Sequence, residues 1–288
     1  MKTVAALIIF GSTLGSTPFV SAFQVPADWK EPIQPFAIVG NIYYVGTAGL
    51  GSFLITTPEG HILLDTPLES ETRIVLDSIR KLGFDPKDIR ILLNSQAHYD
   101  HTGGLAEIKK LSGAQMMAGR GDAELLRRGG RDDFAFGDRY VFPAVEVDRP
   151  LDDGDEIELG GTRILTRLTP GHTRGTTTYV LDVEEGGSRY RVVIAGSLSI
   201  NDGVRLANPP SYEGIADDFA RSFQILESLR PDVFLTAHGF FYGFEEKAAR
   251  LHSGAESNPF IDASHYGPWL AGAKETFETQ LARDHAAK

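Results

Sequence analysis

Residues 96–101 of this chain read Gln-Ala-His-Tyr-Asp-His, and this stretch is the strongest indication of the fold. Three side chains that bind zinc well, those of His98, Asp100 and His101, fall within four positions. They directly follow the apolar run Ile-Arg-Ile-Leu-Leu-Asn at 89–94, which predicts a buried strand. Ligand sites in α/β proteins are usually built just past the end of such strands. The stretch therefore predicts a metal site on an α/β framework.

Two further histidines stand in similar surroundings. His172 lies in a Pro-Gly-His-Thr turn, and His238 follows the strand-like residues 233–236. A catalytic zinc ion takes three protein ligands and leaves a fourth position for water. The candidate metal ligands by residue type are His98, Asp100, His101, His172 and His238. The remaining histidines, which we expect to be structural or solvated, are His61, His252, His265 and His285.

Composition limits the class of protein. The chain has 288 residues, 42% of them hydrophobic and 23% charged, with no Gly/Ser-rich or Pro-rich linker, which predicts one globular domain over 23–288. It has no cysteine, so disulfides, thiol nucleophiles and thiolate metal sites are excluded. The formal net charge of −11 disfavours binding to nucleic acid or to an anionic membrane. We expect neither kind of partner.

The N-terminus has the layout of a secretory signal peptide. Met1 and Lys2 give a positive start, 4–10 is uninterrupted and apolar, and 20–22 read Val-Ser-Ala. A membrane anchor, the alternative, needs an apolar span of about 20 residues. We therefore expect residues 1–22 to be removed and the protein to reach the periplasm.

The order of elements is similar in the two halves of the chain. In the first half, strands are expected at 36–39, 42–45, 52–56, 61–65 and 89–94, with helices at 69–82 and 104–111. In the second half, strands are expected at 157–159, 162–168, 177–183, 190–194 and 233–236, with helices at 216–229, 245–251 and 272–283. Hairpins followed by strand–helix units, occurring twice, predict an α/β protein with two packed sheets and helices outside.

These motifs together resemble the metallo-β-lactamase superfamily. The stretch 96–101 departs from its H-x-H-x-D-H signature only at Gln96, and the Pro-Gly-His-Thr and Ala-His-Gly turns complete the pattern. The segments 40–47 and 60–67 are similar to the third subclass of class B β-lactamases. The resemblance covers the whole mature chain. It implies an αβ/βα four-layer sandwich, two mixed sheets with helices on the outer faces, and zinc along one edge.

The resemblance also implies two ligand sets. The first zinc would take Gln96, His98 and His172, and the second would take Asp100, His101 and His238. A glutamine oxygen is a weaker zinc ligand than imidazole. We therefore expect one or two zinc ions, with the second pocket filled first. Glutamine at this position is similar to the GOB-type branch of the subclass; the alternative is that Gln96 marks decay of the site.

The implied reaction is hydrolysis of β-lactams by zinc-bound hydroxide, with Asp100 orienting the water. Substrates would include penicillins, cephalosporins and carbapenems, and the protein would confer antibiotic resistance. Related lactonases and thioesterases usually carry a bridging Asp where this chain has Ser197. By resemblance, Ser197 and Ser199 would bind the β-lactam carboxylate. Asp65, at the end of a strand-like run, is expected to accept a ring N–H from a ligand histidine.

Two other functions remain open. The chain could be a hydrolase of the same fold that acts on lactones or thioesters, as glyoxalase-II-like enzymes do. It could also be a non-catalytic zinc-binding protein. We expect a monomer, and we expect substrate preference to depend on the loops at 129–142 and 208–212.

Overall fold

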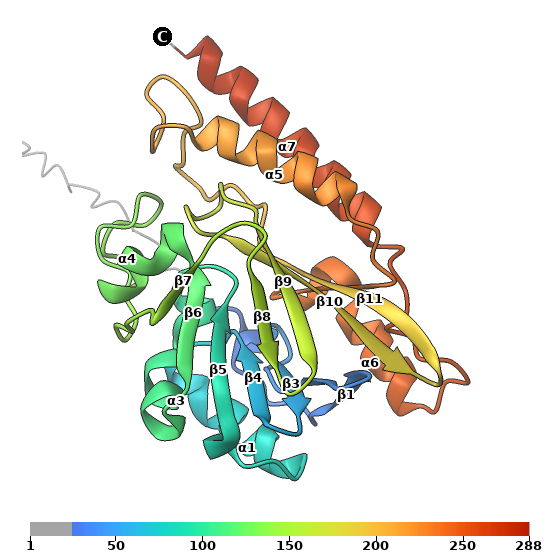
Figure 1. The fold of residues 1–288 in the computed structure, drawn as a ribbon. Coiled ribbons are helices and arrows are strands. Elements are labelled where there is room, and N and C mark those ends of the chain that lie inside the picture. The colour runs from blue at the N-terminus through green and yellow to red at the C-terminus, as the bar shows by residue number, and fades with distance from the viewer. Residues whose placement is uncertain (1–24, 288) are drawn as a thin grey trace, which may run out of the picture.

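Two β-sheets pack face to face in the computed structural model, which describes residues 25–287 (Figure 1). The predicted signal peptide lies outside these residues. The first sheet, in spatial order, consists of β1 (Phe36–Val39), β2 (Ile42–Tyr44), β3 (Phe53–Thr57), β4 (Gly60–Leu64), β5 (Ile89–Asn94), β6 (Gln115–Gly119) and β7 (Arg149–Leu151). The second consists of β12 (Val233–Thr236), β11 (Ser188–Ala195), β10 (Thr177–Glu185), β9 (Thr162–Leu168) and β8 (Glu156–Leu159).

Helices and short turns connect these strands. The α-helices are α1 (Thr72–Lys81), α2 (Tyr99–Thr102), α3 (Leu105–Ser112), α4 (Ala123–Arg127), α5 (Ile215–Ser228), α6 (Phe244–His252) and α7 (Tyr266–Ala286). The 3-10 turns are η1 (Ala27–Trp29), η2 (Glu69–Glu71), η3 (Pro86–Asp88), η4 (Arg120–Asp122) and η5 (Gly239–Tyr242). None of the helices in residues 25–287 is long and apolar enough to cross a membrane.

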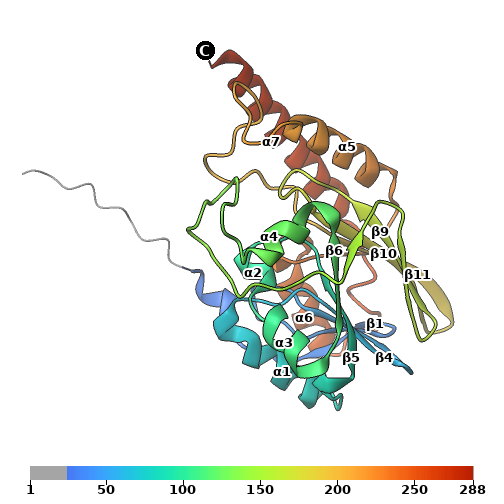
Figure 2. The ribbon, with the colours of Figure 1, turned by 60° about the vertical axis from the view of Figure 1, so that its left-hand side comes forward.

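Alternate side chains of a strand point to opposite faces of the sheet. Because β4 and β5 carry apolar residues at consecutive positions, both faces of the first sheet are apolar. Leu63 and Leu92 face outward and share a core with Val75 of α1 and Ile108 of α3. Their neighbours in the strands face inward and join the core between the two sheets. Figure 2 shows α1 and α3 together on the outer side of the first sheet.

Helices α5 and α7 lie side by side on the far side of the second sheet (Figures 1 and 2). The rings of Phe219 in α5 and Phe277 in α7 are 5.7 Å apart, and Trp269 of α7 lies 5.0 Å from Phe234 of β12. Each helix layer thus buries aromatic or aliphatic side chains against its sheet. The predicted four-layer αβ/βα sandwich is confirmed.

Both halves of the chain contain the same unit. In the first half α1 connects β4 to the parallel strand β5, and in the second α5 connects β11 to the parallel strand β12. The remaining neighbours of β4 and β11 are antiparallel, so both sheets are mixed. The repeat predicted from the sequence is therefore real, and each half ends its unit on a strand that precedes candidate metal ligands.

The sequence analysis missed β6, β7, α2 and α4, and it started the last helix at 272 rather than at Tyr266. Strand β6 reads Gln-Met-Met-Ala-Gly, a composition with weak strand preference. Strand β7 contains Pro150, which fits only because β7 is an edge strand. In α7, Pro268 stands in the first turn, where its missing N–H costs no helical hydrogen bond.

Candidate metal centre

The two crossover strands bring their C-terminal ends to one edge of the sandwich. Residues 96–101 follow β5, and His238 follows β12. Gly51 N donates to Ala237 O at 2.7 Å, and Leu50 forms a β-bridge with His238. These bonds attach the turn after β12 to the first sheet. The ligand candidates from both halves therefore meet at this edge.

Close packing fixes the short helix that carries Asp100 and His101. A Cβ atom on Gly103, directly after α2, would lie 2.1 Å from Glu69 N. A glycine is therefore required for α2 to approach the turn before α1 this closely. Thr102 Oγ1 also donates to His98 O at 2.8 Å. The backbone of α2 is held on both sides.

The second pocket, defined by Asp100, His101 and His238, has the geometry of a metal site. Asp100 Oδ2 lies 3.2 Å from His101 Nε2 and 3.6 Å from His238 Nε2. One ligand atom from each residue falls within 4.8 Å of the others. The side chains of Asp100 and His101 are buried, and that of His238 is 16% exposed.

Three buried nitrogens of this pocket form no aligned hydrogen bond. They are the two ring nitrogens of His101 and Nδ1 of His238, and no described residue offers any of them a hydrogen bond of good geometry. Buried polar atoms are normally paired. A carboxylate and two imidazoles with free nitrogens match the ligand set of a divalent zinc ion. The residues of the second pocket therefore fit the implied metal.

The charges in this pocket set its protonation. Burial alone would raise the pKa of Asp100, but the charge of His101 lowers it well below the usual range. Burial alone would lower the pKa of His101, but the charge of Asp100, its hydrogen bond and the charge of Asp65 together raise it. Burial and the charge of His101 lower the pKa of His238 to about 4. At neutral pH Asp100 is thus ionised and His238 is neutral, which are the forms that bind metal, whereas the raised pKa of His101 favours a protonated ring that must lose a proton when a metal binds.

The first pocket, defined by Gln96, His98 and His172, is also assembled. His98 Nδ1 lies 3.0 Å from His172 Nε2, and Gln96 Nε2 lies 3.2 Å from the same atom. His172 Nδ1 lies 2.6 Å from Ser199 O, a carbonyl that can only accept, so Nδ1 carries the proton. The free lone pair of His172 therefore points at His98 and Gln96. Burial, followed by the charge of His98, holds the pKa of His172 well below 6.5.

The Gln96 amide turns its nitrogen, not its oxygen, toward the first pocket. Gln96 Oε1 accepts a hydrogen bond from Ser197 N at 3.0 Å, and its Nε2 faces His172. An amide nitrogen has no free lone pair and does not ligate zinc. In this orientation the first pocket offers two imidazoles only. Ligation by Gln96 would require the amide to flip and the bond to Ser197 to break.

Asp65 is buried at the end of β4, close to the ligand loop. Its oxygens accept hydrogen bonds from Asn94 Nδ2, Ser95 N and Ser95 Oγ at 2.9, 2.7 and 2.5 Å. Burial raises the pKa of Asp65 to about 6, and the charge of His101 opposes that shift. Asp65 thus positions the chain after β5 through residues 94–95 and acts on His101 by its charge. The predicted ring N–H bond to Asp65 stays a prediction.

Asp122, which the sequence reasoning missed, connects the two ligand loops. Its Oδ2 accepts from Ala97 N at 2.9 Å and from Thr173 Oγ1 at 2.6 Å, and its Oδ1 accepts from Gly175 N at 2.7 Å. Asp122 is 1% exposed, and burial raises its pKa. The available signal was an Asp just after a strand end, but β6 itself was not recognised.

A cavity of about 490 Å³ opens over both pockets. The predicted residues in its wall are Gln96, His98, Asp100, His172, Ser197, Ser199 and His238. His101 is buried beneath them, and Asp65 lies outside the wall. The aromatic residues of the wall, to which the sequence analysis gave no individual role, are Trp29, Tyr99, Phe136, Tyr140, Phe240 and Phe241. The loop at 129–142 contributes to the cavity as expected, whereas no residue of 208–212 lines it.

A sequence model of the metallo-beta-lactamase superfamily matches residues 52–238. The structure is similar to that of BJP-1, a subclass B3 metallo-beta-lactamase of Bradyrhizobium japonicum. The TM-score is 0.84 at 39% identity, and the match covers 91% of this chain and 98% of BJP-1. The native FEZ-1 metallo-beta-lactamase of Legionella gormanii gives a TM-score of 0.86 at 38% identity, covering 90% of this chain and 99% of FEZ-1.

A curated relative is named for a different activity from the two solved structures. The hydroxyacylglutathione hydrolase of Maricaulis maris is 28% identical over 134 residues, which are 46% of this chain and 43% of the relative. The chain thus aligns with less than half the length of that protein. The two solved structures, in contrast, match over nearly their full length.

Proposed function

This chain belongs to the metallo-beta-lactamase superfamily, and on that premise we propose that it is a zinc-dependent β-lactamase. Its substrates are penicillins, cephalosporins and carbapenems, whose strained cyclic amide it opens with water. The family resemblance drawn from the sequence is confirmed, and both solved neighbours are metallo-β-lactamases. The fold alone does not name the substrate, because one fold hosts many hydrolyses.

The observation that carries the proposal is the serine pair in the cavity wall. Ser197 stands where related lactonases and thioesterases are expected to place a bridging carboxylate. In the structure its N–H is bonded to Gln96, and its Oγ accepts from Ser199 N at 3.1 Å. Its hydroxyl proton is therefore free to donate into the cavity. A hydroxyl donor suits the carboxylate of a β-lactam, whereas a bridging aspartate would repel it.

The residues of the second pocket set up the reaction. When bound, zinc supplies hydroxide near neutral pH and polarises the lactam carbonyl. Asp100 stays ionised because its pKa is lowered, so its carboxylate can hold a cation and accept a hydrogen bond from the attacking water. That bond orients the water toward the carbonyl carbon. No serine, cysteine or lysine nucleophile is needed.

The wall of the cavity positions the substrate and excludes water. Trp29 lies 5.5 Å from the ring of His238, and Tyr99 and Tyr140 stack at 4.7 Å. These rings offer an apolar surface beside the second pocket for the side chains of the antibiotic. Ser197 and Ser199, in the wall of the same cavity, hold the carboxylate. The lactam thus contacts both polar and aromatic parts of the wall.

Parallel hydrolysis assays test this function. Purified protein with zinc should hydrolyse imipenem and a chromogenic cephalosporin, and a chelator should abolish both activities. An acyl-homoserine lactone and a glutathione thioester, assayed beside them, should be turned over at least about a thousandfold less efficiently, about 4 kcal/mol in transition-state binding. The reverse ranking would overturn the proposal.

The second candidate function is thioester hydrolysis, favoured by the match to the hydroxyacylglutathione hydrolase. A third outcome, tight zinc binding with no cyclic amide opened at any zinc level, would identify a non-catalytic zinc protein. The same assays therefore separate all three functions.

We further propose that the protein is exported to the periplasm as a monomer and confers resistance. The support for export is the pattern of residues 1–22. N-terminal sequencing of the mature protein should read from Phe23. Sedimentation should give one chain per particle, and expression in a sensitive bacterium should raise the inhibitory concentration of imipenem.

A further inference from the structure

We propose that Asp133 is a positioning residue for the first pocket: its carboxylate holds the ring of His98 with Nδ1 directed at the metal. The proposal rests on the proposed function only in taking zinc as the metal. It makes the loop at 129–142 a determinant of how strongly the first pocket binds zinc.

The contact between the two side chains is short and buried. His98 Nε2 lies 3.3 Å from Asp133 Oδ2, and the exposed fractions of the two side chains are 3% and 4%. No aligned hydrogen bond from the described residues reaches His98 Nε2, and the carboxylate of Asp133 faces that nitrogen. A carboxylate that deeply buried needs a donor facing it.

The loop itself fixes the position of Asp133. Ala135 N donates to Asp133 Oδ1 at 2.9 Å, and the backbone groups of Asp133 and Gly137 exchange hydrogen bonds at 3.2 and 2.7 Å. The ring of Phe136, in the same turn, lies 4.9 Å from the ring of His98. One turn of the loop thus contacts His98 through both a carboxylate and an aromatic ring.

The contact with Asp133 affects which ring nitrogen of His98 carries the proton. Asp133 and His172 compete for the proton of a neutral His98 ring: a carboxylate only accepts, so Asp133 favours the proton on Nε2 and the lone pair on Nδ1. His98 Nδ1 lies 3.0 Å from His172 Nε2, whose lone pair is fixed by the bond between His172 Nδ1 and Ser199 O. A hydrogen bond between these two atoms needs the proton on His98 Nδ1, whereas with the proton on Nε2 their lone pairs repel each other unless a cation lies between them. Asp133 therefore favours a cation at the first pocket.

The second consequence concerns Gln96. The first pocket contains no charged ligand, and the Gln96 amide turns its nitrogen inward. Besides Asp100 and Asp122, which act on the two histidines of this pocket by their charge, the carboxylate of Asp133 supplies negative charge in contact with His98. A carboxylate bonded to a ligand histidine raises the basicity of the imidazole, and removing such a partner typically costs about 10- to 100-fold in metal affinity.

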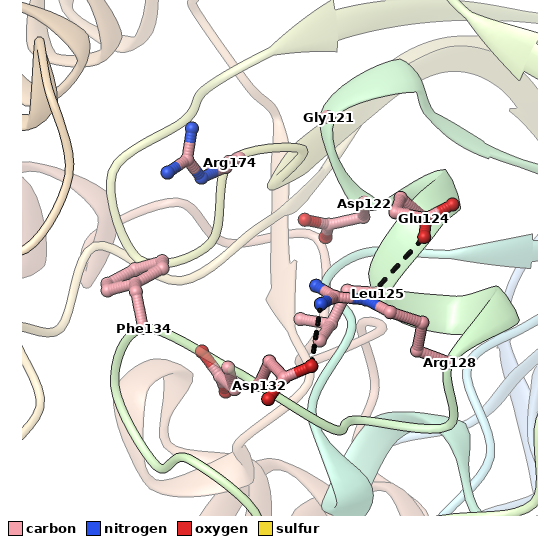
Figure 3. Close-up of a pocket in the computed structure, with 9 residues that line it drawn as sticks. Gly121, Asp122, Glu124, Leu125, Arg128, Asp132, Phe134 and Arg174 are labelled. Atoms are coloured by element: carbon pink, nitrogen blue, oxygen red, sulfur yellow. Dashed lines mark hydrogen bonds and ion pairs between the residues drawn. The ribbon is translucent and has the colours of Figure 1, made fainter.

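The neighbouring Asp132 provides a matched control. Both aspartates line a second cavity of about 310 Å³, but the carboxylate of Asp132 pairs there with Arg128 at 3.2 Å and not with a candidate ligand histidine (Figure 3). Asp132 has a φ of 54°, which asparagine also tolerates, so Asp132→Asn removes a charge without adding backbone strain.

The test is a zinc titration of the full-length protein, stripped of metal and followed by ¹H–¹⁵N spectra of the imidazole rings. The rings of His98 and His172 report the first pocket, and those of His101 and His238 report the second. We expect Asp133→Ala to weaken zinc binding at the first pocket about 10- to 100-fold. Binding at the second pocket should stay within about twofold of the wild type. Asp133→Asn removes the charge and leaves one oxygen for two donors, Ala135 N and His98 Nε2, so its affinity should lie between those of Asp133→Ala and the wild type.

The same spectra report the tautomer before any zinc is added. His98 should carry its proton on Nε2 in the wild type and in Asp132→Asn, and should lose that preference in Asp133→Ala. Circular dichroism during heating identifies any variant that does not fold. The tautomer of His98 in the wild type tests the role of Asp133 even if every variant fails to fold.

Several results would overturn the proposal: an Nδ1–H tautomer of His98 in the wild type, equal first-pocket affinity in Asp133→Ala and Asp132→Asn, or no zinc uptake by the wild-type first pocket. Because no substrate is used, failure to hydrolyse β-lactams would leave this inference standing.

Discussion

The two pockets of the metal centre differ in where their negative charge lies. In the second pocket the carboxylate of Asp100 is itself a ligand and lies within 3.6 Å of both imidazoles. In the first pocket the ligand candidates are neutral, and the carboxylate nearest to His98 is that of Asp133, on its far side. An ion in the second pocket is therefore stabilised by direct contact. An ion in the first depends on groups that the sequence signature does not contain.

The difference also extends to the supporting structure. The second pocket is built on α2 and on the turn after β12, both attached to strands of the sandwich. The first pocket depends on two loops that meet at Asp122 and on a third loop that carries Asp133. We therefore expect mutations near the first pocket to change metal number, and mutations in the second to abolish activity.

The largest effect is expected for Asp100→Ala. Loss of the charged ligand empties the second pocket and removes the group that orients water, so kcat/KM should fall by about a thousandfold or more. Hydrolysis of a chromogenic cephalosporin measures it. The control is Asp202→Ala, a carboxylate in the same cavity wall that is not part of the ligand group. Equal rates for the two variants would contradict the role of the second pocket.

Asp122→Ala should destabilise the protein by about 3 kcal/mol. The change leaves the buried donors of Ala97, Thr173 and Gly175 without their acceptor. Urea unfolding of the zinc-free protein measures the loss. Asp152→Ala removes an exposed carboxylate paired with Arg120 and should cost less than about 1 kcal/mol. Zinc binding at the first pocket should weaken more than binding at the second, since Asp122 supports the first pocket's loops.

Gln96→His should strengthen zinc binding at the first pocket by about 10- to 100-fold, because imidazole replaces an amide that faces the wrong way. Calorimetric titration should then show two tight sites. Gln96→Ala is the control and should leave the tighter of the wild-type sites unchanged. If Gln96→Ala removed that site instead, the assignment of the tight ion to the second pocket would be wrong.

The smallest effect is a pH dependence of the zinc-free protein. The pKa of His238 is lowered to about 4 in the folded state from 6.5. Between these values the unfolded chain binds a proton that the folded chain does not, so stability falls as pH falls from 6.5 to 4. From pH 7 to pH 5 the wild type should lose about 2 kcal/mol more than His238→Gln in urea unfolding. Parallel losses in both proteins would contradict the lowered pKa.

The positions of the ligand residues could be predicted from the sequence, for physical reasons. The ligand residues of the second pocket follow strands β5 and β12, whose apolar runs are recognisable, so their meeting at one edge follows from the fold. The structure brings all six predicted ligand positions together at this edge, and whether they bind zinc stays a prediction. The orientation of the Gln96 amide depends on Ser197 N, a backbone group far along the chain, and no local pattern reveals it.

The supporting acids were not predictable in the same way. Asp122 follows a strand of weak strand preference, and Asp133 lies in a loop whose conformation depends on its own hydrogen bonds. Trp29 reaches the cavity only because Ala48 N and Gly49 N donate to backbone oxygens of Glu31 and Asp28. Such contacts are made by tertiary packing, and the spacing of residues along the chain does not predict them.

The parallel pairing of β12 with β11 has a consequence for synthesis. A nascent chain leaves the ribosome N-terminus first, so the loop with Asp100 and His101 emerges long before His238. Until β12 has joined β11, the second pocket lacks one of its three ligands. Any fragment that stops before that strand lacks one ligand of the second pocket, and uptake of an ion into that pocket therefore marks a chain whose second sheet is finished.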